Sequence, residues 1–241
     1  QVRGKDIILT GSQIFAQTQP STPGKDLVIN ASDSLNLSAG ALIANFALGE
    51  AQGGNAIAQA TSLNLTGVNT QIATSASEQG EAGDVMVMET SEVKLSEGAL
   101  IRTSVFDEAE AGDVIVKADS IELIGTFSDG MQLSPCAFST EATSTRDSGN
   151  ITVDTRQLSI KDGANITAST GNEGNAGNIE IKGADIQLEG TATNGEDPSG
   201  IFAAVREGVE NPGNAGTITI ETNGLTLKAG AQINSVARGD S

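Results

Sequence analysis

Residues 83–101 read GDVMVMETSEVKLSEGALI and hold one complete unit of a repeat that runs along this chain. After the opening Gly-Asp, Val85 and Val87 alternate with methionines. Val93 and Leu95 then alternate with polar residues, and Gly-Ala-Leu-Ile closes the unit at Ile101. Alternation with a period of two is typical of a β-strand with one buried face. The unit therefore predicts three short strands separated by polar and glycine-containing turns.

The opening polar residue of this unit returns along the whole chain. At eight positions, which we call the anchors, a polar residue, usually Asp or Asn after Gly, precedes an apolar-x-apolar triplet. Successive anchors are 20, 29, 29, 29, 37, 28 and 39 residues apart, so four of the seven spacings lie within one residue of 29. A period of this length indicates a repeat architecture. The anchors are Asp6, Asp26, Asn55, Asp84, Asp113, Asn150, Asn178 and Thr217.

Short strands of this kind become stable when equivalent strands of successive repeats stack in parallel, about 4.8 Å apart. The inward side chains then form aliphatic columns, for example Val85 next to Val114 next to Ile151. The sequence predicts an all-β chain, a right-handed parallel β-helix (β-solenoid) of about eight turns with three short strands per turn. We expect residues 1–241 to be a single domain and a fragment of a longer array.

Two parts of the repeat are irregular. Segments 126–135 and 191–200 are predicted to be insertions before the third strand. The loops after that strand, 45–53, 75–82, 103–111, 140–148 and 206–215, are expected to vary most in length and to gather at one edge, where binding is expected. The sequence does not show which residues of 136–138 and 201–205 point inward.

The composition argues against several functions. The chain has 29 glycines and six phenylalanines but no Trp, Tyr or His, so the usual proton shuttle and the usual sugar-stacking rings are missing. Its net charge of −18 disfavours nucleic acid and anionic membrane surfaces as partners. No apolar run is long enough for membrane insertion as a helix. The single cysteine, Cys136, excludes an internal disulfide and is expected to be a buried thiol.

The anchors are the most repeated polar feature and have two interpretations. Their side chains can form a structural ladder of hydrogen bonds to turn amides, for which the candidates are Asp6, Asp26, Asn55, Asp84, Asp113, Asn150 and Asn178. Alternatively, Asp84 and Asp113, one turn apart, can supply oxygen ligands to calcium. No other cofactor is expected. Acidic residues in the loops are interpreted as solvated charge or as weak cation bridges between molecules: Glu78, Glu81, Asp107, Glu108, Glu110, Glu196, Asp197, Glu207 and Glu210.

The repeat resembles that of a known family. Residues 174–181, GNAGNIEI, and 158–166, LSIKDGANI, together with their copies, resemble filamentous haemagglutinin-like exoproteins, above all the large cyanobacterial surface proteins of that group. The resemblance implies a β-helix passenger that an outer-membrane β-barrel transporter exports by two-partner secretion. The Asn-Pro-containing motifs of the family's secretion domain are not visible, since Asn211-Pro212 falls in a late loop.

We therefore expect a non-catalytic structural or adhesive shaft, secreted or attached to the cell surface at the outer membrane, with receptors that the sequence does not name. The alternative is a carbohydrate-active β-helix, either a polysaccharide lyase or a glycosidase, because such enzymes also use this fold.

Overall fold

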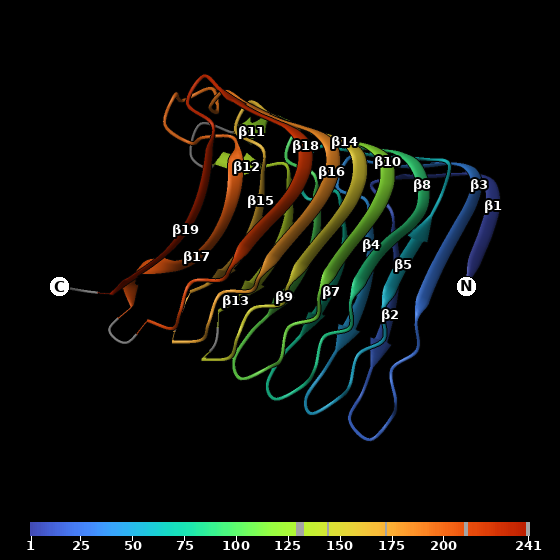
Figure 1. Cartoon of the computed structure of the whole chain (residues 1–241). Helices are drawn as coiled ribbons and strands as arrows, with labels where there is room; N and C mark the ends of the chain where they lie inside the picture. Colours follow the sequence, from blue (N-terminus) through green and yellow to red (C-terminus); the bar gives the residue numbers. More distant parts are fainter. Residues whose placement is uncertain (129–132, 144, 172, 210–211, 240–241) are drawn as a thin grey trace.

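The computed structural model describes residues 1–128, 133–143, 145–171, 173–209 and 212–239. The chain is a parallel β-solenoid of about eight turns, and the turns lie side by side from the N-terminus to the C-terminus (Figure 1). The predicted fold class is confirmed. The described ranges contain strands and no helix, so they offer no helical segment that could span a membrane.

One sheet is built from the first and second strands of every turn. Its strand order is β1-β3-β5-β8-β10-β14-β16-β18, with β6 between β3 and β8. The bounds are β1 Val2–Thr10, β3 Leu27–Ser38, β5 Ala56–Gln59, β6 Ser62–Thr66, β8 Val85–Ser96, β10 Val114–Ile124, β14 Ile151–Lys161, β16 Ile179–Glu189 and β18 Ile218–Lys228.

The third strands form the second sheet, in the order β19-β17-β15-β13-β9-β7-β4-β2. A separate two-stranded antiparallel sheet joins β11 to β12. The bounds are β2 Gln13–Thr18, β4 Leu42–Ala47, β7 Gln71–Ala76, β9 Leu100–Val105, β11 Thr126–Ser128, β12 Leu133–Pro135, β13 Ala137–Ala142, β15 Asn165–Thr170, β17 Gly200–Val209 and β19 Gln232–Gly239.

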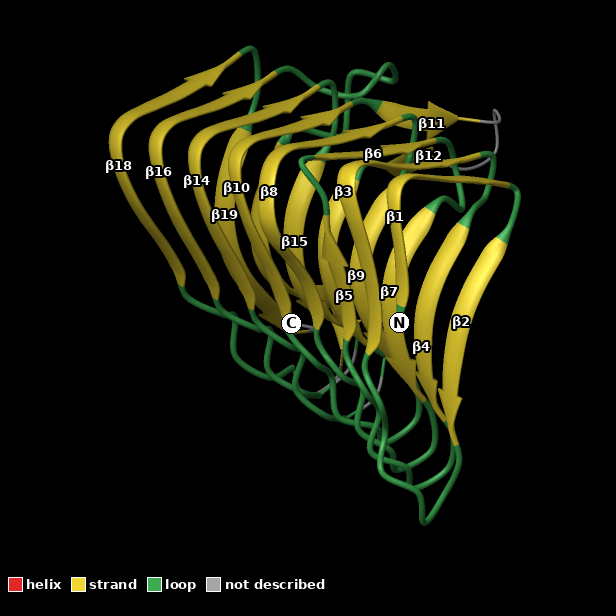
Figure 2. Ribbon diagram, turned by 90° about the vertical axis from the view of Figure 1, so that its right-hand side faces the viewer, coloured by secondary structure: helices red, strands yellow, loops and turns green. Residues whose placement is uncertain are grey.

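In most turns the first two predicted strands are fused into one long strand that bends (Figure 2). They are separate only in the third turn, as β5 and β6. Elsewhere pairing continues across the bend: Lys117 pairs with Asp154 and Ala118 with Thr155. Between β8 and β10 and between β1 and β3 the register shifts at the bend, and pairing resumes in the second-strand part.

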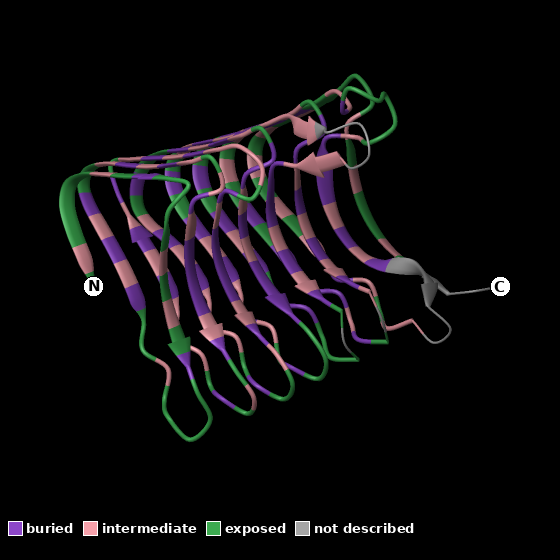
Figure 3. Cartoon of the chain, turned by 180° about the vertical axis from the view of Figure 1, so that it is seen from behind, coloured by how far each residue is buried: buried purple, intermediate pink, exposed green. Residues whose placement is uncertain are grey.

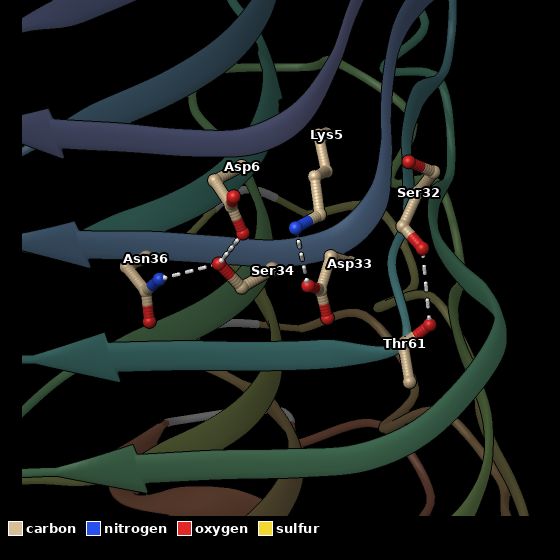
Figure 4. Close-up of polar contacts among 7 residues, drawn as sticks. All are labelled: Lys5, Asp6, Ser32, Asp33, Ser34, Asn36 and Thr61. Atoms are coloured by element: carbon tan, nitrogen blue, oxygen red, sulfur yellow. Dashed lines mark hydrogen bonds and ion pairs between the residues drawn. The ribbon is translucent and has the colours of Figure 1, made fainter.

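Asp6 is not an anchor, contrary to the sequence-based prediction. It pairs with Ser34 and Ile7 pairs with Leu35, so this segment is the second strand of its turn. The Ser34 hydroxyl donates to the Asp6 carboxylate at 2.8 Å, and Figure 4 shows this contact. The polar-apolar-x-apolar pattern does not distinguish the two strands, because a polar residue also precedes the apolar triplet of the second strand. The spacing of 20 residues from Asp6 to Asp26 reflects this difference.

The core is a tube of stacked aliphatic side chains, and buried positions recur on successive strands along its length (Figure 3). Val85, Val114 and Ile151 are aligned in neighbouring strands as predicted, and each is fully buried. Burial of such a side chain stabilises the fold by about 1.5–3 kcal/mol before chain entropy is subtracted. Regular columns of this kind replace the large aromatic residues that anchor most globular cores.

The structure also decides the orientation of the third strand. Phe138 is fully buried and pairs with Ile101 and Ile166, so it belongs to the inward column. In the later turn Ile201 is fully buried as well, whereas Phe202 is only partly buried. The two phenylalanines therefore occupy opposite faces of the same sheet.

The loops occupy two edges, not one. Connections from a third strand to the next first strand follow the lower edge in Figure 1, and the β11–β12 hairpin lies at the opposite edge. The second insertion is closed by an antiparallel bridge between Thr191 and Pro198. The predicted insertions at 126–135 and 191–200 thus flank the corner before the third strand, although residues 129–132 lie outside the described ranges.

Candidate functional site

The anchors from Asp26 to Thr217 form one continuous column, at the corner where each loop enters the next first strand. In every step the backbone N–H of one anchor donates to the side-chain Oδ1 of the anchor one turn earlier. The donor–acceptor pairs are Asn55 to Asp26 (2.9 Å), Asp84 to Asn55 (2.8 Å), Asp113 to Asp84 (2.8 Å), Asn150 to Asp113 (2.7 Å), Asn178 to Asn150 (3.0 Å) and Thr217 to Asn178 (2.8 Å).

This anchor ladder explains why Asp and Asn exchange freely at the position. Only an oxygen acceptor on a short side chain is required, and both residues supply one. Each hydrogen bond of this partly exposed ladder contributes about 0.5–1.5 kcal/mol to stability. The side-chain amide of Asn150 adds a second contact to Asp113 Oδ1, at 3.2 Å.

The residue before each anchor from Asn55 to Thr217 is glycine, because the turns approach closely there. A Cβ atom placed on Gly149 would lie 1.9 Å from the carbonyl oxygen of Gly112, and one on Gly177 would lie 1.8 Å from that of Gly149. No side chain fits at such distances. The Gly-Asx pair is therefore one structural unit: the glycine admits the neighbouring backbone, and the anchor side chain binds to it.

A second polar column ties this corner to the opposite sheet. The hydroxyls of Thr74, Thr103 and Thr140 point inward from the third strands and are fully buried. They donate to the carbonyl oxygens of the glycines that precede the anchors: Thr74 to Gly83 (2.5 Å), Thr103 to Gly112 (2.8 Å) and Thr140 to Gly149 (2.6 Å). Sequence reasoning missed this column. Its signal is a Thr two residues after the inward apolar residue.

A further ladder of the same design lies three residues before the anchors. The backbone N–H of Asn175 donates to Asp147 Oδ1 at 2.8 Å, and that of Asn214 donates to Asn175 Oδ1 at 2.8 Å. Both side-chain amides repeat the contact at 3.0 Å. The sequence contains a usable signal that was overlooked, since an Asx residue precedes each of the anchors Asn150, Asn178 and Thr217 by three positions.

Like charges meet within the anchor ladder at one place. Asp84 and Asp113 are successive members, and burial raises the pKa of Asp84 above its ordinary value, with the charges of Asp113 and Asp26 acting in the same direction. The hydrogen bond from the Asp113 backbone opposes this rise. Ionised Asp84 therefore lowers the free energy of unfolding slightly, because the folded state favours the protonated form.

The calcium hypothesis concerns the same two carboxylates. Each uses Oδ1 as a ladder acceptor. Calcium takes six to eight oxygen ligands, often from several carboxylates. Within the described ranges, no group of three or more His, Cys, Asp or Glu residues is placed to hold a metal ion. A calcium ion at this place would depend on the two Oδ2 atoms and on solvent.

Acidic side chains also line the loop edge. Glu50, Glu78, Asp107 and Glu108 surround a shallow depression of 490 Å³ together with Gln79. Some carboxylates already have partners: the backbone N–H of Glu78 donates to Asp107, and the Gln52 amide donates to Glu81. Glu196 and Asp197 lie in the insertion at the other edge, where the Asn194 amide donates to Asp197. The side chains of Glu207 and Glu210 lie outside the described set.

Cys136 is a buried free thiol, as predicted. Its sulfur accepts a hydrogen bond from the backbone N–H of Gly98 and donates one to the carbonyl of Ile124, each at 3.1 Å. Burial raises the pKa of the Cys136 thiol to about 11. The thiol is therefore protonated at neutral pH, and reactivity requires the thiolate.

Together, the fold and the ladders define a parallel β-solenoid whose turns are tied to one another at one corner. No protein-family model, curated protein or solved structure matches this chain.

Proposed function

We propose that this chain is a non-catalytic shaft of a secreted or cell-surface adhesin of the filamentous haemagglutinin-like type, exported by two-partner secretion through an outer-membrane β-barrel transporter. The observation that carries the proposal is the anchor ladder, which links every turn from Asp26 to Thr217 without a break. A rod needs such uniform turn-to-turn bonding along its axis, whereas an enzyme needs one specialised turn.

The distribution of charge supports the same proposal. The chain carries a net charge of −18, and its acidic residues are spread over both loop edges. Charge of one sign keeps a long rod soluble and prevents rods from associating along their sides. Divalent cations would weaken that repulsion, as expected of an aggregating surface protein.

The proposal is tested with the purified chain coupled to latex beads. Beads carrying the chain are expected to bind cells or extracellular polysaccharide films, whereas beads carrying an unrelated acidic protein of equal charge are not. The same preparation is expected to release no reducing ends or unsaturated products from neutral and acidic polysaccharides, with or without calcium. Turnover of any of them would favour the carbohydrate-active alternative and contradict the shaft.

Export is tested separately. The chain is fused behind a two-partner secretion domain and expressed with the matching outer-membrane transporter. We expect it to reach the medium or the cell surface only when the transporter is present. Retention inside the cell despite a working transporter would contradict the export route while leaving the adhesive role open to the bead assay.

A further inference from the structure

A shallow groove crosses the outer face of four neighbouring strands, β8, β10, β14 and β16. It consists of two adjoining depressions of 310 and 340 Å³ that share Ser120, Gln157 and Asp185. Buried Ile121 and Leu158 contribute to its floor. The groove is lined by the second-strand part of these turns, away from the anchor ladder and from the acidic loop edge.

The polar side chains of the groove stand in rows along the solenoid axis. Glu92, Ser120, Gln157 and Asp185 occupy equivalent positions on successive strands and so form one row. Adjacent members are separated by the spacing of parallel strands, about 4.8 Å. The row therefore offers a carboxylate, a hydroxyl, an amide and a second carboxylate at regular intervals to a ligand that lies along the axis.

A second row runs two residues further along each strand. Glu122, Ser159 and Gln187 are aligned there. The Oγ atom of Ser159 is buried and has no hydrogen-bond partner. A buried hydroxyl without a partner costs about 1–3 kcal/mol. The Ser159 hydroxyl lies beneath the surface of the groove, so the accessible polar groups of this row are those of Glu122 and Gln187.

The charges of the groove restrict the class of ligand. Glu122 is neutralised within the protein by Lys94 at 3.0 Å and Lys161 at 4.0 Å. Arg156 is paired with Asp119 at 3.1 Å, so Glu92 and Asp185 leave the groove negative, in a chain that is already strongly acidic. Anionic ligands are disfavoured there, and no aromatic ring lines the groove, so a ligand would be recognised through hydrogen bonds and not through ring stacking.

We propose that this groove binds an uncharged oligosaccharide chain that lies along the solenoid axis. Sugar hydroxyls both donate and accept, so they match rows of carboxylates, amides and hydroxyls, and a linear chain of rings matches sites that repeat once per turn. The proposal rests on the adhesive function proposed above, for which it names the ligand class and the surface.

The probes are three neutral hexasaccharides, cellohexaose, maltohexaose and chitohexaose, titrated into the complete chain by isothermal calorimetry. At least one is expected to bind, and Gln157→Ala and Ser120→Ala should each weaken it by about tenfold, the loss expected for one or two hydrogen bonds. Ser62→Ala is the matched control, because Ser62 belongs to the same row as Ser120 but lies outside the groove. It should leave affinity unchanged.

The melting temperature separates a binding role from a structural one. Because Ser120 and Gln157 lie on the outer face of the sheet, neither substitution should lower it. Absence of binding by all three sugars at millimolar concentration would overturn the proposal. So would binding that neither groove variant weakens, or tighter binding of an acidic hexagalacturonate. Beads that still adhere when both groove residues are replaced would refute the groove and leave the adhesive shaft standing.

Discussion

The corner before the first strand and the corner before the third strand carry the chain around the same solenoid by different means. At the first of these, the inward third-strand position and the next anchor are ten residues apart in turn after turn, as in Thr74 to Asp84 and Thr103 to Asp113. At the second, the inward residues Leu95 and Ile101 are six apart, but Leu123 and Phe138 are fifteen apart. The anchor spacing of 37 residues comes from this second corner, whereas the spacing of 39 comes from both, since Leu188 and Ile201 are thirteen apart and the following loop is also longer.

The difference corrects the expectation that the loops after the third strand vary most. Only the last of them is longer, with fourteen residues from Ala203 to Thr217. The anchor corner is constrained because each anchor bonds to the next turn and each threonine bonds to a glycine carbonyl across the corner. At the other corner the N–H groups of Gly40, Gly98 and Gly163 donate to Thr70, Cys136 and Ser199 one turn later. Two of these three bonds cross a step that contains an insertion, so a hairpin can be added there without disturbing either sheet.

Substitution at an anchor-corner glycine should give the largest effect. Gly149→Ala places a methyl group 1.9 Å from the Gly112 carbonyl, so it should destabilise the chain by about 3 kcal/mol or more, or prevent folding. Gly224→Ala is the control, since the nearest atom to its Cβ is Asp185 Oδ1 at 3.7 Å. Urea unfolding followed by circular dichroism compares them. Equal stability of the two variants would show that the turns can separate at this corner.

Loss of one anchor side chain should have the next largest effect. Asp113→Ala leaves the N–H of Asn150 without its acceptor, at an expected cost of about 0.5–1.5 kcal/mol because water reaches this exposed corner. Asp113→Asn keeps an oxygen in the same place and should cost far less. The same unfolding assay measures both. If the alanine and asparagine variants were equally stable, the ladder would contribute nothing to the fold.

Asp84→Asn should stabilise the chain slightly, by less than about 1 kcal/mol at neutral pH, because exposed charges are well screened. The raised pKa of Asp84 in the folded state means that the fold loses stability as pH rises through the window between the unfolded and folded values. The gain from the variant should therefore disappear below the ordinary pKa of 3.8. Melting curves of the unsubstituted chain and of Asp84→Asn, recorded across this pH range, test whether the difference in stability changes in this direction.

Calcium can be tested in the same melting curves. The ladder alone predicts equal melting temperatures in calcium chloride and in EDTA. A rise in calcium that Asp84→Asn removes would instead establish the metal site at Asp84 and Asp113.

Shortening the insertion at the other corner should have the smallest effect. Deletion of residues 193–197 shortens an exposed loop, and loop-closure entropy changes by only about 0.6 kcal/mol for each doubling of length. Ser199 must be kept, because its hydroxyl accepts from the N–H of Gly163 at 2.9 Å and donates to the Glu189 carbonyl at 2.7 Å. A loss comparable to that of Gly149→Ala would show that the two corners are equally constrained.

The sequence by itself determined the period, the strand-forming segments and the parallel stacking. The alternation of apolar residues is a local property, and it can be read directly from each repeat of the sequence. It also revealed the anchor position, since Gly-Asx before an apolar triplet is a local pattern.

Only the tertiary structure decided that Asp6 belongs to a second strand, that Phe138 points inward, and that the buried threonines bond to glycine carbonyls. The first two depend on register with strands of neighbouring turns, which are about 29 residues or more distant in the sequence but only one strand spacing away in the fold. The threonine bonds depend on how the chain folds back across a corner nine residues long.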